Sequence, residues 1–394
     1  MTRLTVPDDD LFGLHNLPYG VYSVPGQEPR VAVRYGGHVV DVGLLLGDEE
    51  TFGRSTLNTF MAQGRERWNK VRAAITTALG SDVPEAAVHP VDAVTLHLPF
   101  EVADYVDFYA SEHHASNLGR LFRPDNPDPL TPNWKHLPIG YHGRSASIVV
   151  SGTDIVRPSG QRKGPQDEAP LFGPSIRLDI EAELGFVVGT GSPMGEPVPA
   201  EHADDHIFGV VLFNDWSARD IQAWEYVPLG PNLGKSFAST ISAWVVPMLA
   251  LVAARVDTPA QEPEVFPYLA LERPWGLDID LEVVWNGHVV SRPPYAAMYW
   301  SPAQMLAHLT VNGAPTRTGD VFASGTISGP GKDERGAFIE LTWDGQQPVE
   351  VGGVERTFLE DGDEVSLTAT APAVGGRRLG LGEARGRVVP AKWR

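Results

Sequence analysis

The chain has 394 residues, of which 42% are hydrophobic and 21% are charged, a composition typical of a globular protein long enough for two domains. Its formal charge of −19 argues against nucleic acid and anionic membranes as partners, because both would repel it, and favours small ligands or metal ions. The absence of Cys excludes thiolate nucleophiles, disulfides and Cys-ligated zinc. We expect a cytoplasmic protein, since the start, MTRLTVPDDD, lacks an apolar signal segment and the longest apolar run, near residues 243–254, contains Pro247.

The 41 Gly and 34 Pro residues, set among short β-branched runs, predict a mainly β protein with few helices. Residues 18–45 contain three short predicted strands (YGVYSV, RVAVRYG and HVVDVG), the pattern of a small barrel or roll. Residues 56–80 have helical spacing. The dense motifs all lie after the Pro-bounded stretch HPVDAVTLHLPF. We therefore predict two domains, residues 1–98 and residues 99–394.

The segment DYVDFYASEHHASNLGRLFRP brings an acid, a phenol, an imidazole and a guanidinium into one short stretch: Asp107, Tyr109, His114 and Arg123. These groups can serve as a metal ligand, a substrate contact, a base and an anchor for a carboxylate. Because His113 and His114 are adjacent, only one of them can point at a given site from a helix. A surface turn with a capping histidine is the alternative interpretation.

The segment LDIEAELGF predicts a β-strand over residues 178–186 with Glu181 and Glu183 on one face. Two carboxylates about 7 Å apart repel each other, so burying them costs free energy unless a cation lies between them. We therefore predict a metal site here, with a solvated edge strand as the alternative. The predicted polar face carries Arg177, Asp179, Glu181 and Glu183, and the predicted buried apolar face carries Ile176, Leu178, Ile180, Ala182, Leu184 and Phe186.

The apolar run IFGVVLF predicts a buried strand that places Asp215 near its end, and WSARDIQAWEY then predicts a short helix that stops before Pro228. A polar stripe on this helix fits a binding face and a solvated face equally well. The stripe consists, at positions i, i+3 and i+7, of Arg219, Gln222 and Tyr226. The side chains left for the core are Trp216, Ala223 and Trp224.

The segment LGPNLGKSFAST fits neither of the two motifs that it suggests. It is not a phosphate loop, because three residues instead of four separate Gly230 from Gly234. It is a poor nucleophile elbow, because Ala238 stands where a glycine is expected. We predict instead that Lys235 lies close to the acidic residues and offsets part of their negative charge.

Two segments near the C-terminus carry further candidates. VFASGTISGP places Thr326 in a Gly-flanked turn, where backbone and hydroxyl donors can approach an anion. GAFIELTWDG predicts a strand that carries Glu340 on the same face as Phe338 and Thr342. A lone strand glutamate usually faces solvent, but paired with a histidine across the fold it would orient and charge-stabilise the imidazole.

Taken together, the segments DFY, HHASNLGRLFRP, PIGYHGR, LDIEAELGF, HIFGVVLFNDWSARDIQAWEYVPLGP, LGKSF and ASGTISGP resemble the fumarylacetoacetate hydrolase family. The similarity covers most of the chain after about residue 99 and is weaker before it. It implies a small N-terminal SH3-like β-barrel domain, a larger C-terminal domain of the β-roll or barrel type, and a homodimer. The implied reaction is hydrolysis of a carbon–carbon bond of fumarylacetoacetate to fumarate and acetoacetate, the last step of tyrosine and phenylalanine breakdown.

The resemblance also implies roles for individual residues. A divalent cation, calcium, magnesium or manganese, would be held by Asp107, Glu181, Glu183 and Asp215. The general base would be His114, oriented by Glu340. The groups implied to stabilise the oxyanion are Arg219, Gln222 and Lys235. Those implied to hold the dicarboxylic substrate are Tyr109, Arg123, Tyr141, Gln222, Tyr226 and Thr326. A second, structural magnesium site would use Lys235 and a residue near Ser239, where Ala238 and Ser239 replace the Gly and Thr of the family.

Three other functions stay open from the sequence. The first is a related enzyme of the same fold that acts on another β-diketo acid, such as an acylpyruvate hydrolase, or a decarboxylase or isomerase. The long NDWSARDIQ match argues against it. The second is a serine hydrolase, and the third is a non-catalytic metal-binding β-scaffold in which His114 and Glu340 do not meet.

Overall fold

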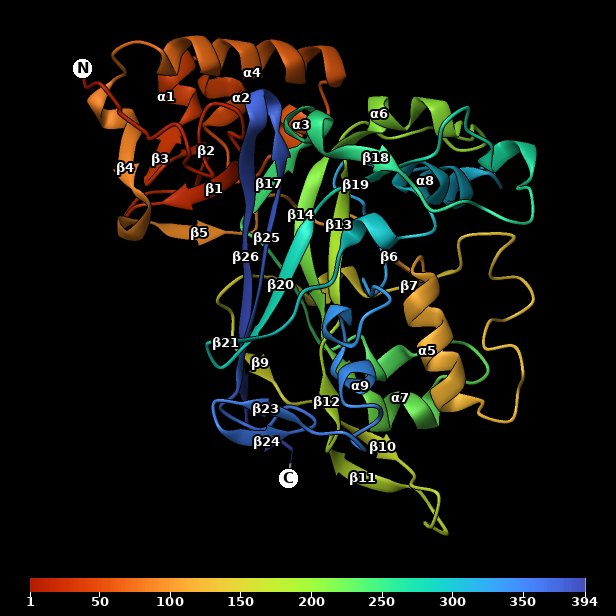
Figure 1. Ribbon diagram of the computed structural model, residues 1–394. Helices are drawn as coiled ribbons and strands as arrows, with labels where there is room; N and C mark the ends of the chain where they lie inside the picture. The colour runs from red at the N-terminus through yellow and green to blue at the C-terminus, as the bar shows by residue number, and fades with distance from the viewer. Residues whose placement is uncertain (394) are drawn as a thin grey trace.

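The computed structural model describes residues 1–393, and one large β-sheet runs through the molecule (Figure 1). The sheet has 13 strands. Its main path runs in the order β4 (Val88–Pro90), β3 (His38–Asp41), β2 (Arg30–Tyr35), β1 (Tyr19–Ser23), β17 (Trp244–Pro247), β14 (Ile207–Asp215), β13 (Ala182–Val188), β22 (Val321–Ala323), β6 (Tyr105–Phe108) and β7 (Gly140–His142). Beside this path lie β5 (Thr95–His97), β8 (Ile148–Val150) and β16 (Ser239–Ile241).

The N-terminal strands are continuous with the rest of this sheet. β1 pairs antiparallel with β17, so that Gly20 lies opposite Trp244. A side chain at Gly20 would come within 2.7 Å of the indole ring, which explains why only glycine fits there. Tyr19 also packs on Phe208 from the C-terminal part, with ring centroids 5.6 Å apart. The two predicted parts of the chain therefore share a sheet and a core, and the division at residues 98 and 99 stays a prediction.

The predicted N-terminal elements are confirmed with one correction. All three predicted strands form as β1, β2 and β3, but the end of the third segment begins the helix α1 (Val42–Leu46) instead. The cause is local, because the side chain of Asp41 caps this helix by accepting from the amide of Leu44 at 2.8 Å. The helical region 56–80 contains two helices, α3 (Asn58–Met61) and α4 (Arg65–Leu79), and α2 (Glu49–Phe52) precedes them. α4 packs through Trp68, Val71, Ile75 and Leu79.

A second sheet of five strands packs beside the first, with β25 and β26 next to β14 (Figure 1). Its order is β21 (His288–Ser291), β20 (Asp280–Trp285), β25 (Glu364–Ala373), β26 (Arg377–Val389) and β9 (Ile155–Val156). β26 passes close to the residues that follow β14, because a Cβ added at Gly386 would lie 2.6 Å from the ring of Trp216. Trp216 is fully buried there, as the sequence predicted, and it anchors the segment next to Asp215.

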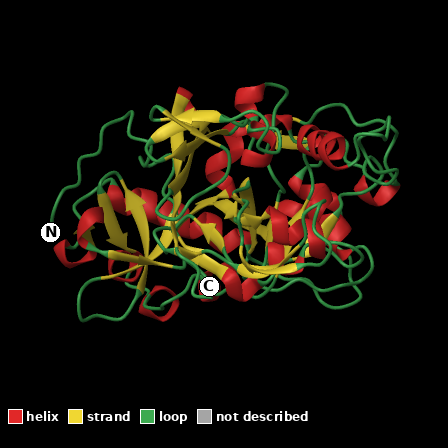
Figure 2. Cartoon of the chain, turned by 90° about the horizontal axis from the view of Figure 1, so that it is seen from below, coloured by secondary structure: helices red, strands yellow, loops and turns green. Residues whose placement is uncertain are grey.

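The remaining elements surround the sheets, and the view from below (Figure 2) shows strands running through the middle with helices and loops around them. The helices are α5 (Glu112–Phe122), α6 (Ala203–His206), α7 (Arg219–Glu225), α8 (Pro302–Thr310) and α9 (Phe338–Leu341). The strands are β10 (Ser159–Arg162), β11 (Leu171–Pro174), β12 (Leu178–Asp179), β15 (Ser217–Ala218), β18 (Arg255–Asp257), β19 (Trp275–Leu277), β23 (Val349–Val351) and β24 (Val354–Arg356). The predicted mainly β fold with some α-helix is confirmed. Within residues 1–393, the structure has no helix long and apolar enough to cross a membrane.

Candidate active site

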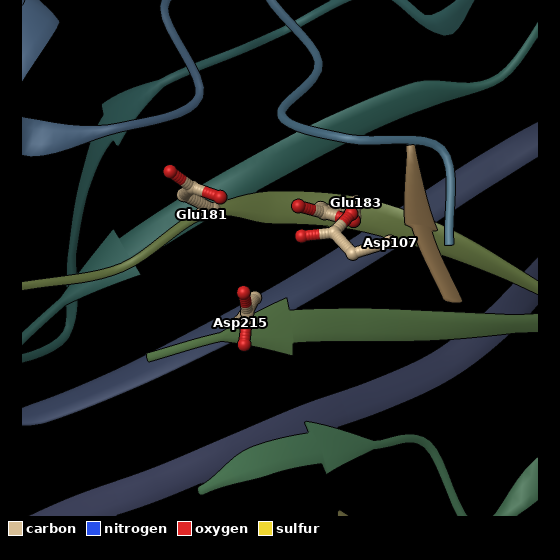
Figure 3. Close-up of side chains that lie close together, drawn as sticks. All are labelled: Asp107, Glu181, Glu183 and Asp215. Carbon is tan, nitrogen blue, oxygen red and sulfur yellow. The ribbon is translucent and has the colours of Figure 1, made fainter. Parts of the chain in front are cut away.

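Four buried carboxylates meet where neighbouring strands of the large sheet begin or end (Figure 3). Each of them offers an oxygen atom, and these atoms all lie within 4.8 Å of one another. The residues are the four that the sequence singled out: Asp107 on β6, Glu181 just before β13, Glu183 on β13 and Asp215 at the end of β14.

Strand pairing explains why residues so distant in the sequence converge. β13 lies between β14 and β22, and β22 pairs in parallel with β6, with Ala323 opposite Asp107. Asp107 therefore lies two strands away from β13, and Figure 3 shows its side chain beside that of Glu183. On the other side, the backbone amide of Asp215 donates to the carbonyl oxygen of Glu181 at 3.1 Å. The three segments together produce one acidic pocket.

Two cations balance one half of this cluster. The ammonium of Lys235 contacts Glu181 and donates to Oδ2 of Asp215 at 2.8 Å. Arg219 Nη1 lies 2.7 Å from Glu181 Oε1. Burial acts to raise the pKa of Glu181, but Lys235 and Arg219 outweigh it and hold that pKa below its ordinary value. The prediction that Lys235 lies close to the carboxylates is therefore confirmed.

Two hydroxyl groups add hydrogen bonds to Asp215. Tyr141 donates to Oδ2 at 3.1 Å, and Ser239 donates to Oδ1 at 2.9 Å. β14 and β16 place Ser239 directly opposite Asp215 in the register. Ser239 thus lies next to the carboxylate cluster.

The other half of the cluster, Asp107 and Glu183, has little compensation. Asp107 Oδ1 and Glu183 Oε1 are buried and have no hydrogen-bond partner among residues 1–393. Burial raises the pKa of both carboxyl groups well above their usual range, and the charge of Asp215 adds to the effect on Asp107. Unpartnered, buried carboxylate oxygens that converge on one point are what a divalent cation would coordinate. These donors fit a hard, oxygen-preferring ion.

The predicted single strand over residues 178–186 is wrong, because the structure breaks it into β12 and β13. β12 pairs with β15, whereas β13 pairs with β14 and β22. Glu181 lies in the break and Asp179 accepts a hydrogen bond from Nε of Arg219 at 2.8 Å. Ile176, predicted to be buried, has 67% of its surface exposed. Alternation of side chains could not reveal that the two ends of this segment pair with different partners.

A histidine and a glutamate form a second buried unit beside the carboxylates. His114 Nδ1 lies 2.6 Å from Glu340 Oε2, and both side chains are buried. Glu340 also accepts from Asn117 at 2.9 Å and from Ser328 at 2.9 Å. Burial acts to raise the pKa of Glu340, but His114 and these hydrogen bonds lower it below its ordinary value. The neighbouring His113 is only half-buried and takes no part in this network.

The predicted strand for Glu340 is wrong, because this residue lies on the short helix α9 (Phe338–Leu341). The amides of Phe338 and Ile339 donate to the carboxylate of Asp179 at 2.7 and 3.0 Å, which caps the helix from a distant segment. Trp343, with φ of 48°, follows the helix in the left-handed region and ends it. The period-2 pattern of FIELTW carries no signal of that distant cap.

The predicted polar stripe on α7 forms in part. Arg219 is buried and donates from Nη1 to the side-chain oxygen of Gln222 at 3.1 Å, so these two residues lie together beside the carboxylates. Tyr226 lies at the C-terminal end of α7 with 49% of its surface exposed. Trp224, which the sequence assigned to the core, is 43% exposed.

The other predicted substrate contacts differ in their surroundings, and their role in binding stays a prediction. Tyr109 packs edge-on against the His114 ring, with centroids 5.4 Å apart. Thr326 is buried, and its hydroxyl has no partner among residues 1–393. Arg123 is exposed and donates to the carbonyl oxygen of Pro129 at 3.0 Å. A cavity of about 450 Å³ is lined by residues that include Tyr141, Asp215 and Lys235.

Sequence reasoning missed two residues that hold this site together, Asn117 and Ser328, and gave no role of its own to a third, Asp179. Asn117 and Ser328 bind Glu340, and Asp179 binds Arg219 and caps α9. Asn117 could have been found, because it lies three residues after His114 and shares a helix face with it. Ser328 gave no local signal, and the pattern that placed Asp179 on the polar face could not show its partners, because Arg219 and α9 lie elsewhere in the chain.

Comparison with known proteins identifies the family. The sequence profile described as fumarylacetoacetate (FAA) hydrolase C-terminal matches residues 104–389, and that described as fumarylacetoacetase N-terminal matches residues 15–99. The chain belongs to the fumarylacetoacetate hydrolase family. Relatives of this family named fumarylacetoacetase include those of Bos taurus, 44% identical over 99% of this chain and 99% of the relative, and of Caenorhabditis elegans, 46% identical over 98% and 99%.

Solved structures support the fold of this fumarylacetoacetate hydrolase family member. A fumarylacetoacetate hydrolase from psychrophilic Exiguobacterium antarcticum matches with a TM-score of 0.57 and 18% identity, covering 95% of this chain and 99% of that one. Maleylpyruvate hydrolase from Sphingobium sp. SYK-6, in complex with manganese(II) ion and pyruvate, matches with a TM-score of 0.55 and 14% identity, covering 95% and 100%. At these identities the likeness establishes the fold alone.

Proposed function

We propose that this protein is the hydrolase that cleaves fumarylacetoacetate into fumarate and acetoacetate, the last step of tyrosine and phenylalanine catabolism. The observation that carries the proposal is the buried His114 and Glu340 pair beside a cluster of four carboxylates. Relatives with 44% identity over nearly the whole chain are named for this reaction. The chain is an enzyme of this family, and a related β-diketo acid hydrolase is the less favoured reading.

The carboxylates would hold a divalent cation, and calcium or magnesium, with manganese as a further possibility, suits their all-oxygen donor set. When bound, the ion supplies a Lewis acid that polarises the oxo groups of the substrate. Asp107 and Glu183 carry the unpartnered oxygens that such an ion would satisfy. Lys235 and Ser239 are proposed to support a second, structural site, for which the Ser239 hydroxyl beside Asp215 is the supporting contact.

His114 is proposed as the general base. Its Nδ1 faces Glu340, which leaves Nε2 to accept a proton from water, and Glu340 stabilises the imidazolium that results. The hydroxide then attacks the carbonyl carbon next to the fumaroyl end. Asn117 and Ser328 keep the Glu340 carboxylate in place through their hydrogen bonds. The nucleophile in this mechanism is therefore water, and Ser328 serves only to hold Glu340 in place.

The oxyanion that forms in this attack would be stabilised by Arg219, Gln222 and Lys235. Arg219 Nη2 is buried and has no partner among residues 1–393, so a donor is available. The carbon–carbon bond breaks as the oxyanion collapses. The electron pair of the broken bond stays with the carbon atom of the acetoacetate fragment, and this carbon then takes up a proton. The substrate itself would be held by Tyr109, Arg123, Tyr141, Gln222, Tyr226 and Thr326.

Product analysis tests this function. The purified protein is mixed with fumarylacetoacetate, the loss of ultraviolet absorbance is followed, and the products are quantified by chromatography. We expect one fumarate and one acetoacetate for each substrate molecule consumed. Acylpyruvates serve as competing substrates in a matched assay. Absence of fumarate, or a higher kcat/KM for an acylpyruvate, would contradict the proposal.

Three features remain predictions. The homodimer would be checked by light scattering on a sizing column. The cytoplasmic location would be checked by cell fractionation. The division into residues 1–98, as an SH3-like barrel domain, and residues 99–394 would be checked by expressing each part separately and recording whether it folds.

A further inference from the structure

Asp179 stands in the acidic row of the sequence but lies outside the carboxylate cluster. Its side chain is fully buried, and its two oxygens are used by groups of the protein. Oδ1 accepts from the amides of Ile180 and Phe338, each at 2.7 Å. Oδ2 accepts from the amide of Ile339 at 3.0 Å and from Nε of Arg219 at 2.8 Å. One carboxylate therefore joins three segments of the chain.

The first of these connections concerns α9, the helix that carries Glu340. α9 has four residues, too few to be stable by themselves, and its own N-cap residue, Ala337, has no side chain that could cap it. Asp179 supplies the missing acceptor for the first two amides of the helix, 159 and 160 residues away in the sequence. The carboxylate of Asp179 thereby sets the place of Glu340, and through it the orientation of His114.

The second connection concerns Arg219. Asp179 holds its Nε, while Nη1 reaches Glu181 and Gln222. The guanidinium is planar and rigid. Once two of its three nitrogen atoms are held by hydrogen bonds, the position of the third is fixed as well. That third nitrogen, Nη2, is the one without a partner among the described residues.

We propose that Asp179 is a positioning residue for the reaction: it fixes the oxyanion donor Arg219 and the glutamate that orients the base in one common geometry. This inference rests on the roles proposed above for Arg219 and Glu340. Asp179 itself touches neither substrate nor ion, because its lone pairs are taken by protein donors. Its effect on the reaction passes through the two residues that it holds.

The test is the variant Asp179→Asn with a matched control, Asp363→Asn. Asp363 is another buried carboxylate, and it accepts from Arg356 at 3.2 Å and from the backbone amide of Glu360 at 2.8 Å. Both variants replace a buried carboxylate that pairs with an arginine and accepts from a backbone amide. Only Asp179→Asn disturbs groups of the candidate active site.

We expect Asp179→Asn to lower kcat by about 10-fold to 100-fold, the usual cost of removing an outer-shell partner, while KM and the affinity for Ca²⁺ or Mg²⁺ change by less than about threefold. Asp363→Asn should leave kcat unchanged. Turnover is expressed per metal-binding site counted by calorimetry, so that unfolded molecules do not enter the comparison. Asp179→Glu is the second variant, since it keeps the charge opposite Arg219 but its longer side chain cannot keep both amide bonds to α9. It should also lower kcat.

A double-mutant cycle shows whether the effect passes through the partners. The fold-loss caused by Asp179→Asn should shrink in the background of Glu340→Gln and again in that of Arg219→Lys. An unchanged loss in both backgrounds, or an equal loss from Asp363→Asn, would overturn the inference and leave the proposed function intact. If Glu340→Gln and Arg219→Lys are themselves silent, the roles proposed for these two residues fail and the inference fails with them, whereas the proposed function is decided separately by the product analysis.

Discussion

The buried carboxylate of Glu340 and the buried carboxylates of Asp107 and Glu183 differ in how the protein balances their charge. Glu340 has a cationic or polar partner for each oxygen, from His114, Asn117 and Ser328, and its pKa is held low. Asp107 and Glu183 each have a buried oxygen without a partner among residues 1–393, and burial raises the pKa of both. Glu340 is fully hydrogen-bonded within the chain, whereas Asp107 and Glu183 would be completed by the divalent cation proposed above.

This difference separates two tasks. A carboxylate that orients a base must hold its charge and its position in every state of the enzyme, so its hydrogen bonds are all internal. Carboxylates that bind an ion must keep lone pairs available, and in the absence of the ion they repel each other and cost stability. We therefore expect substitutions at the two kinds of carboxylate to differ in their effects on turnover and ion affinity, and to have opposite effects on stability.

The largest effect is expected at the base. His114→Ala should lower kcat by about 10² to 10⁴, the usual contribution of a general base, and leave metal affinity nearly unchanged. His113→Ala is the matched control, because this neighbouring histidine is half-buried and does not contact Glu340. Steady-state kinetics on both variants is the measurement. Equal losses would indicate a structural role for the whole turn, and a silent His114→Ala would end the mechanism.

The next effect concerns ion affinity. Glu183→Gln removes one charged ligand and should weaken binding of Ca²⁺ or Mg²⁺ by at least about tenfold. Glu340→Gln serves as the control of similar size and burial, and it should leave the affinity unchanged, because its oxygens face His114, Asn117 and Ser328. Calorimetric titration distinguishes the two. If both variants bind the ion as the unsubstituted protein does, the cluster is not the metal site.

Stability without the ion should change in the opposite order. Glu183→Gln removes a poorly compensated buried carboxylate and should raise the free energy of unfolding of the chelator-treated protein by about 1 to 2 kcal/mol. Glu340→Gln breaks a satisfied pair and should lower it by about 1 to 3 kcal/mol. Chemical denaturation in the presence of chelator measures both. A loss of stability in Glu183→Gln would mean that this carboxylate is already compensated within the chain.

The last effect is on the pH dependence of stability. Because the folded-state pKa of Asp107 is raised, the folded protein binds more protons than the unfolded one. This contribution is fully present below the unfolded pKa of about 4 and is lost as the pH rises through the folded pKa, with a slope of up to about 1.4 kcal/mol per pH unit and proton. Asp107→Asn should flatten the decline in melting temperature between pH 5 and 8 in chelator. Identical slopes would contradict the raised pKa.

The sequence predicted the parts of the site whose signals are local. Alternation around Glu183 and the apolar strand that ends at Asp215 are patterns within single segments, and the structure places both residues in the cluster. The helix of Glu340 could not be predicted, because its cap, Asp179, comes from another part of the chain. The break between β12 and β13 is also a tertiary effect, since the two strands pair with different neighbours. The register of β22 against β6, which brings in Asp107, has no local signal either.

In the proposed mechanism, the four carboxylates hold the ion on which hydrolysis depends. The most direct test follows the ultraviolet absorbance of fumarylacetoacetate with chelator-treated protein while Ca²⁺ or Mg²⁺ is added back, with ion binding measured by calorimetry on the same preparation. Activity should return in proportion to the occupancy of the site formed by the four carboxylates, and Glu183→Gln should need at least about tenfold more ion to reach half of its activity. Full activity in the chelator-treated protein, or recovery that is the same in Glu183→Gln, would contradict the account.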